Sequence, residues 1–299
     1  FLDNRFNLSF DFYSNTTYDM LMSVNLPPSV GTSSMNVNFG QLNNKGLDLS
    51  LSAQIIRNKD WFWSVTLTGG HVMDQIRKIS EGLKNDIDNP YDSSKPKILF
   101  VEGGSQYDIY AMRSAGIDPA TGKEIFIKKN GEYTFKYDEN ERVAVGNTNP
   151  ILQGSLMNTL RYKGFSISVA TSYTFGSDYY NSTLKNKVEN IDLNYNVDRR
   201  VFTDRWKQPG DHTRFLGIGT SSSSNQYSER FVEKRNELYI SSIQVMYDFA
   251  PKAITRLGLR KLAIGFGLSD IAHISTVKFE RGTEYPYCRG INLIFRPTF

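Results

Sequence analysis

The sequence contains one cysteine, Cys288, among 299 residues. A lone cysteine excludes an internal disulfide framework and a metal cluster that is built on several thiolates. Histidine is nearly as scarce, and the spacing of His71, His212 and His273 matches no zinc-binding motif. We therefore expect neither a disulfide scaffold nor a histidine or cysteine metal centre, and we expect no cofactor.

The chain also lacks long apolar runs and an excess of one charge. No segment approaches the roughly 18 consecutive apolar residues of a membrane helix, so any membrane crossing must be made by strands. The 35 basic and 31 acidic residues are balanced and form no basic block, which does not indicate nucleic-acid binding. A nucleophile elbow and a phosphate-binding loop are both missing, so we do not expect an enzyme.

Aromatic residues are abundant, with 17 Tyr and 19 Phe, and this composition favours strands. Segments of the chain alternate apolar and polar residues, the pattern of a strand with one apolar and one polar face. In the clearest segment, Phe165, Ile167 and Val169 alternate with Ser166 and Ser168. The alternating segments are residues 6–13, 47–55, 61–68, 152–162, 165–176, 239–249, 260–268 and 287–299.

The connections between these segments alternate in length. Residues 58–60, 163–164 and 251–258 are short connections, whereas 21–40, 79–150, 177–232 and 271–286 are long. Outer-membrane barrels have short periplasmic turns and longer extracellular loops. The sequence therefore predicts an all-β, antiparallel transmembrane β-barrel of about eight strands, in which 79–150 and 177–232 are large extracellular loops. The alternating piece 106–112 belongs to a loop subdomain, because a ninth wall strand would break this alternation.

Two other architectures fit the same pattern. An even number of strands permits a complete, self-closed small outer-membrane barrel that acts as an adhesin or a structural protein. Alternating strands also form soluble carbohydrate-binding β-sandwiches and hydrolases, whose apolar faces are buried between two sheets. The first residues already alternate as a strand does, so we expect no signal peptide within the sequence.

Several short segments resemble the SusC/RagA-type TonB-dependent outer-membrane transporters of Bacteroidetes. They are Leu-Pro-Pro-Ser-Val-Gly at 26–31, Asn-Lys-Gly-Leu-Asp at 44–48, Trp-Phe-Trp at 61–63, Ala-Gly-Ile-Asp-Pro-Ala-Thr-Gly at 115–122, Asp-Arg-Trp-Lys-Gln-Pro-Gly-Asp at 204–211 and the final Phe299. The resemblance implies that residues 1–299 are the C-terminal portion of a barrel of roughly 22 strands, without its plug domain. It places the protein in the cell outer membrane as a multi-pass protein in contact with lipid.

The same resemblance implies a function and partners. It implies TonB-dependent import of glycans or peptides, with a SusD-like surface lipoprotein as a partner of the extracellular loops. The contact with TonB, ExbB and ExbD would be made by an N-terminal part that lies outside this sequence. This chain would supply barrel wall and the loops that meet substrate or lipoprotein.

The predicted external loops contain aromatic and arginine side chains that we interpret as substrate contacts, because aromatic rings stack and guanidinium groups donate several hydrogen bonds. These residues are Tyr179, Tyr180, Arg199, Arg200, Arg205, Trp206, Arg214 and Tyr227. Asp86, Asp88 and Asp92 are spaced like calcium ligands but lack the glycine and the closing glutamate of a calcium loop. We interpret them as solvated loop carboxylates, with a structural calcium site as the alternative hypothesis.

A further group of aromatic residues belongs to the predicted wall. Trp61, Trp63, Phe295 and Phe299 lie at strand ends, where amphipathic rings favour the interface between membrane and water. A terminal phenylalanine such as Phe299 also resembles the signal by which the barrel assembly machinery recognises its clients. We therefore predict Phe299 as an assembly signal.

Overall fold

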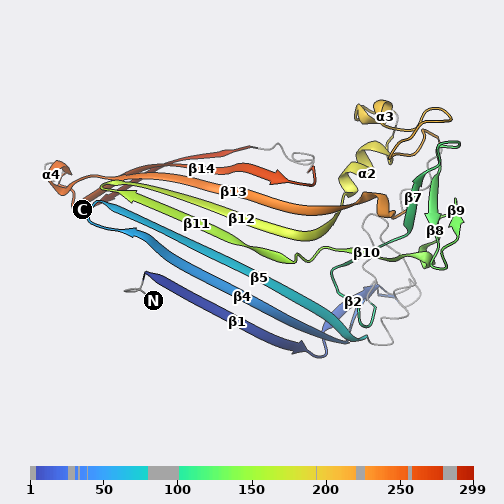
Figure 1. Cartoon of the computed structure of the whole chain (residues 1–299), viewed down its shortest axis with the longest axis horizontal. Coiled ribbons are helices and arrows are strands. Elements are labelled where there is room, and N and C mark those ends of the chain that lie inside the picture. The colour runs from blue at the N-terminus through green and yellow to red at the C-terminus, as the bar shows by residue number, and fades with distance from the viewer. Residues whose placement is uncertain are drawn as a thin grey trace.

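The main feature of the fold is an eight-stranded antiparallel sheet, in the order β1-β4-β5-β11-β12-β13-β14-β15 (Figure 1). The computed structural model describes residues 5–25, 31–32, 34–38, 40–79, 101–192, 194–219, 226–254, 258–278 and 288–299. The sheet strands are β1 (Phe6–Thr17), β4 (Gly40–Arg57), β5 (Trp61–Ile79), β11 (Leu152–Tyr162), β12 (Phe165–Tyr180), β13 (Val232–Asp248), β14 (Lys261–Ser275) and β15 (Gly290–Thr298). Each predicted wall segment is confirmed as one of these strands.

The remaining elements gather at the end of the sheet that has the long connections, except α4 (Pro251–Ile254), which lies at the other end (Figure 1). They are β2 (Leu21–Asn25), β3 (Ser34–Asn38), β6 (Asp108–Ala111), β7 (Arg113–Ile117), β8 (Glu124–Ile127), β9 (Tyr133–Thr134), β10 (Val143–Asn147), α2 (Ser182–Val188), α3 (Arg200–Thr203) and the 3-10 turns η2 (Glu139–Glu141) and η3 (Glu229–Phe231). Strand β6 pairs with β10 outside the large sheet, so the prediction that 106–112 lies in a loop subdomain is confirmed. Within the described ranges, no helix combines the length and apolar character needed to cross a membrane.

One face of the large sheet is apolar from strand to strand. Leu8, Leu51, Leu67 and Leu156 lie in register on four neighbouring strands and form one row of this face. Leu8 is 59% exposed and the other three side chains are partly exposed, while Leu293 on β15 is 86% exposed. No second sheet covers this face in the described part of the chain. The sandwich interpretation, which needs such a cover, is therefore wrong, and the exposed apolar face is that of a transmembrane β-barrel.

The opposite face carries small polar side chains. A row across it contains Ser9, Ser50, Thr68, Ser155 and Ser172. Hydroxyl groups in this face bond across strands, as the Oγ1 of Thr68 and the Oγ of Ser155 do at 2.8 Å. Such a face is suited to the aqueous interior of a barrel.

The edges of the sheet are open. Strand β1 forms one edge and β15 the other, and the described residues contain no pairing between them. The self-closed eight-stranded barrel is therefore wrong, and these strands form an arc of barrel wall.

Gly154 on β11 leaves room for a tyrosine that crosses it. The hydroxyl of Tyr173 on β12 donates to the carbonyl oxygen of Thr68 on β5, at 2.7 Å. A Cβ at Gly154 would lie 1.9 Å from that carbonyl oxygen and 2.7 Å from the Tyr173 hydroxyl. We expect Gly154→Ala to lower the free energy of unfolding by about 1–3 kcal/mol through overpacking.

Urea-induced unfolding in detergent would measure this effect. Gly267→Ala on β14 is the control, because a Cβ there would meet its nearest atom at 3.7 Å. Equal losses for the two variants would contradict the assignment of a special role to Gly154.

Candidate functional site

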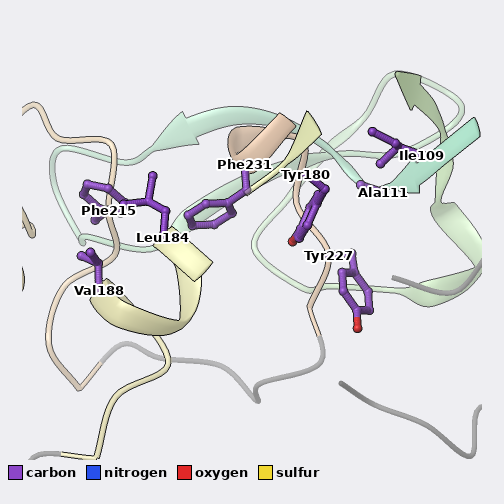
Figure 2. Close-up of a cluster of buried hydrophobic side chains, with 8 residues drawn as sticks. All are labelled: Ile109, Ala111, Tyr180, Leu184, Val188, Phe215, Tyr227 and Phe231. Carbon is purple, nitrogen blue, oxygen red and sulfur yellow. The ribbon is translucent and has the colours of Figure 1, made fainter. Parts of the chain in front are cut away.

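The described residues of 101–151 and 181–231 fold together at the long-loop end, and we call this unit the loop lobe. Its core joins both segments to the end of β12 (Figure 2). The buried side chains of this core are Ile109, Ala111, Tyr180, Leu184, Val188, Phe215, Tyr227 and Phe231. The lobe therefore has a hydrophobic core of its own, separate from the lipid-facing rows of the sheet.

Helix α2 is fixed to this core at its start. The Oδ1 of Asn181 accepts a hydrogen bond from the backbone N–H of Leu184 at 3.0 Å, which caps the helix. Asn181 also donates its own backbone N–H to the carbonyl of Phe231 at 2.8 Å. Leu184 and Val188 lie one turn apart, so both point into the core.

A buried ionic cluster connects the two segments of the lobe. The guanidinium of Arg230 donates to Glu124 from Nη2 at 2.7 Å and to Glu189 from Nη1 at 2.9 Å. The Oγ of Ser228 donates to the other oxygen of Glu124. Burial alone lowers the pKa of Arg230, but the bonds and charges of the two carboxylates outweigh it and raise this pKa. Arg230 therefore stays charged and joins β8 to the segment after α2.

Three of the residues that we predicted as substrate contacts are buried in the lobe. Tyr180, Tyr227 and Arg205 are 8%, 7% and 3% exposed, so they present little surface to a solute. Arg205 donates to the backbone carbonyls of Leu216 at 2.7 Å, Gly217 at 2.8 Å and Val188 at 3.2 Å. These contacts give all three side chains a structural role in the lobe.

Trp206 is also engaged in packing. Its Nε1 donates to the carbonyl of Pro119 at 2.9 Å. Gly122 lies against the indole, because a Cβ at this glycine would be 2.4 Å from the ring. Trp206 thus packs the turn at residues 118–122 onto the α3 region.

The remaining predicted contacts lie nearer the surface. Arg199 is exposed, and Tyr179 is half-buried. Arg200 pairs with Asp198 at 2.6 Å, and the half-exposed Arg214 pairs with Glu233 at 2.7 Å. A role for these four residues in substrate contact stays a prediction.

The three aspartates with calcium-like spacing receive no structural description. Asp86, Asp88 and Asp92 lie outside the described residues. Elsewhere in the described ranges, no three His, Cys, Asp or Glu side chains are placed to hold a metal ion. His273 lies against Glu237 on the polar face of the sheet.

The aromatic residues of the wall lie near the short connections. The rings of Trp61 and Tyr162 are 4.3 Å apart between centroids. Trp63 donates from Nε1 to the Oδ1 of Asn158 at 2.8 Å, which satisfies two polar groups on the apolar face. Phe295 and Phe299 are 65% and 80% exposed. Their roles at the membrane interface, and that of Phe299 in assembly, stay predictions.

The loop between α2 and α3 forms a crevice that the sequence did not predict. Asn186 and Asn190 line one side, and Tyr195, Asn196 and Asp198 are among the other lining residues. Tyr195 is 76% exposed. The available signal was a tyrosine between two asparagines, at 194–196, in a polar loop. In the described part of the chain, none of the eight predicted contact residues lines this crevice.

Lys185 is a buried lysine next to the core of the lobe. Its Nζ donates to the carbonyl of Gln226 and lies 5.2 Å from the centroid of the Tyr227 ring. Burial lowers the pKa of Lys185 from 10.5 to about 8. Because the folded pKa lies below the unfolded one, the unfolded chain binds more protons between these values, and stability rises with pH there.

We therefore expect thermal unfolding of the loop lobe to shift to higher temperature as the pH rises from about 8 to about 10. Burial raises the pKa of Tyr180 above its ordinary value of 10.0, so tyrosine ionisation opposes the trend only at higher pH. Near-ultraviolet circular dichroism would follow the transition. Lys185→Met should lose this rise, and a variant that keeps it would contradict the assignment to Lys185.

Comparison with known proteins agrees with this architecture. Residues 1–116 match the family described as TonB dependent receptor-like, beta-barrel. The chain is 25% identical over 312 residues to TonB-dependent receptor P39 of Formosa agariphila, with 89% of this chain and 30% of that protein covered. It is also 25% identical to TonB-dependent receptor SusC of Bacteroides thetaiotaomicron, with 83% of this chain and 25% of SusC covered. The chain thus spans under a third of the length of these relatives.

Solved structures show the same fold. The RagAB peptide transporter superposes with a TM-score of 0.75 at 21% identity, covering 92% of this chain and 30% of that one. The RagAB peptide importer in its open-open state superposes with a TM-score of 0.73 at 23% identity. The apolar and polar faces, the alternating connections and these relatives lead to one conclusion: the chain is similar in sequence and in fold to the β-barrel part of TonB-dependent receptors.

Proposed function

We propose that the chain forms barrel wall and loop lobe of an outer-membrane importer. The imported solute would be a glycan or peptide fragment, moved by TonB-dependent energy coupling, with a SusD-like lipoprotein over the loops. The observation that carries this proposal is the loop lobe, which has its own hydrophobic core and a buried ionic cluster. Connecting adjacent strands needs only a short turn, so long loops of this kind are typical of a functional role.

The relatives support transport rather than catalysis. SusC and P39 carry the name TonB-dependent receptor, and RagAB is called a peptide transporter. Similarity to these proteins also supports three further parts of the proposal: the coupling to TonB, the SusD-like partner and the multi-pass outer-membrane location.

Deletion of the full-length gene and complementation with it would test the proposal. Cells that lack the gene should lose uptake of at least one labelled oligosaccharide or oligopeptide, and the gene should restore it. The importer proposal would be contradicted if uptake of every labelled oligosaccharide and oligopeptide were unchanged, or if the protein were recovered outside the outer-membrane fraction.

A further inference from the structure

We propose that the crevice between α2 and α3 binds a neutral saccharide, with the Tyr195 ring as its stacking surface. We call it the Tyr195 crevice. The inference rests on the proposed import function, since it gives the chemical class of a solute that the loop lobe meets. It is a binding site on the loops, and none of its lining residues is among those that the loop composition suggested.

The first observation is the way in which Tyr195 is presented. The Oδ1 of Asp192 accepts from the backbone and the side-chain amide of Asn194, at 2.9 and 2.8 Å. The backbone N–H of Tyr195 then donates to the carbonyl of Asp192 at 3.2 Å. This turn holds a ring that is 76% exposed, and a flat aromatic face complements the C–H face of a pyranose.

The second observation is the chemistry of the crevice walls. Asn186 and Asn190 lie on one side, where the Nδ2 of Asn190 donates to the Oδ1 of Asn186 at 3.1 Å and orients this amide. The exposed Asn196 lines the crevice as well. Amide groups both donate and accept hydrogen bonds, which suits sugar hydroxyls because these also do both.

The third observation is the charge of the crevice. Asp198 accepts from the Nε of Arg200 at 2.9 Å and from its Nη2 at 2.6 Å, so this carboxylate is compensated within the lobe. The other charged lining residues are Lys187 and Asp192, which have opposite signs. These charges cancel, and the crevice therefore favours an uncharged ligand over an anionic or cationic one.

The fourth observation concerns the framework of the crevice. Helix α2 inserts Leu184 and Val188 into the lobe core, and the Val188 carbonyl accepts from Arg205 Nη1 at 3.2 Å. A wall that is anchored in this way is largely preformed, which lowers the entropic cost of binding. The walls consist of a helix and turns, whereas recognition of an extended peptide backbone uses a strand edge. This difference favours a saccharide over a peptide.

Isothermal titration calorimetry of the full-length protein in detergent would test the site. The probes are three neutral hexasaccharides (cellohexaose, laminarihexaose and mannohexaose), the anionic hexamer of galacturonic acid, and a neutral glycine–serine hexapeptide. We expect a neutral hexasaccharide to bind, and Tyr195→Ala to weaken its Kd about tenfold, as loss of one aromatic contact does. Tyr195→Phe keeps the ring and should retain most of the affinity.

Tyr133→Ala is the matched control, because Tyr133 on β9 is 70% exposed but does not line the crevice. It should leave the Kd unchanged. The inference is overturned if no neutral hexasaccharide binds, if only the anionic hexamer or the peptide binds, or if Tyr195→Ala binds like the unaltered protein. Binding is measured without transport, so loss of the importer proposal in cells and loss of the crevice in the calorimeter are separate results.

Discussion

Replacing Arg230 with methionine is expected to destabilise the loop lobe by about 3–5 kcal/mol, because removal of one partner leaves the other charges of a buried ionic cluster uncompensated. The side chains of Arg230, Glu124 and Glu189 are 7%, 4% and 3% exposed, so water cannot replace the lost guanidinium. The two carboxylates belong to segments on opposite sides of β11 and β12 in the sequence. Loss of Arg230 should therefore loosen both segments together.

Amide hydrogen exchange of the full-length protein would measure this effect. Exchange in α2 and β8 should accelerate about a hundredfold or more, the factor that corresponds to a loss of about 3 kcal/mol. Strands β1 and β4 do not contribute to the lobe, so their exchange should be unchanged.

Two variants serve as controls for Arg230→Met. Arg214→Met removes an arginine whose side chain is 42% exposed, and an exposed ion pair contributes only about 0–1 kcal/mol. The triple variant with Glu124→Gln and Glu189→Gln removes the uncompensated charges and should recover part of the loss. An Arg230→Met protein whose exchange equals that of Arg214→Met would show that the cluster does not hold the lobe.

The wall strands could be predicted from the sequence because their two faces meet different solvents. Where a strand contacts lipid on one side and water on the other, apolar and polar side chains alternate. This alternation at residues 165–176 predicted most of β12. The strand ends next to the long loops were not predicted, because the apolar–polar alternation does not extend into them. Strand β13 begins at Val232, and residues 233–237 are Glu, Lys, Arg, Asn and Glu, which have no apolar face. This part lies on the loop side of the lipid-facing rows and needs none.

The loop residues were harder to predict, because a long loop can build its own core. Tyr180 and Tyr227 were interpreted as stacking surfaces, yet their rings lie 5.7 Å apart inside the lobe. The bond between Arg230 and Glu124 joins residues 106 positions apart. No local sequence pattern indicates such a contact, because in the sequence both residues look like ordinary solvated charges of a loop. Tyr195 shows the reverse case, an aromatic residue that remains at the surface.

The assignment of the two faces leads to a second prediction at adjacent positions on β11. Leu156 lies in the apolar row with Leu67, whereas Met157 pairs with Thr66 and Ala170 on the polar face. A charged side chain on the lipid face costs about 2–4 kcal/mol near the bilayer midplane, but a charge that faces water does not carry this cost. We therefore expect Leu156→Arg to lower the free energy of unfolding by that amount, and Met157→Arg to have a much smaller effect.

Urea-induced unfolding of the full-length protein from lipid vesicles would compare these variants. Leu156→Ala separates the loss of the leucine side chain from the cost of the charge, because it removes apolar volume without adding an ion. Leu156→Arg should be the least stable of the three, since arginine must also desolvate or draw water into the bilayer. If Met157→Arg were instead the more damaging change, lipid would contact the serine-rich face. Neither the barrel interior nor the position of the loop lobe could then be as described.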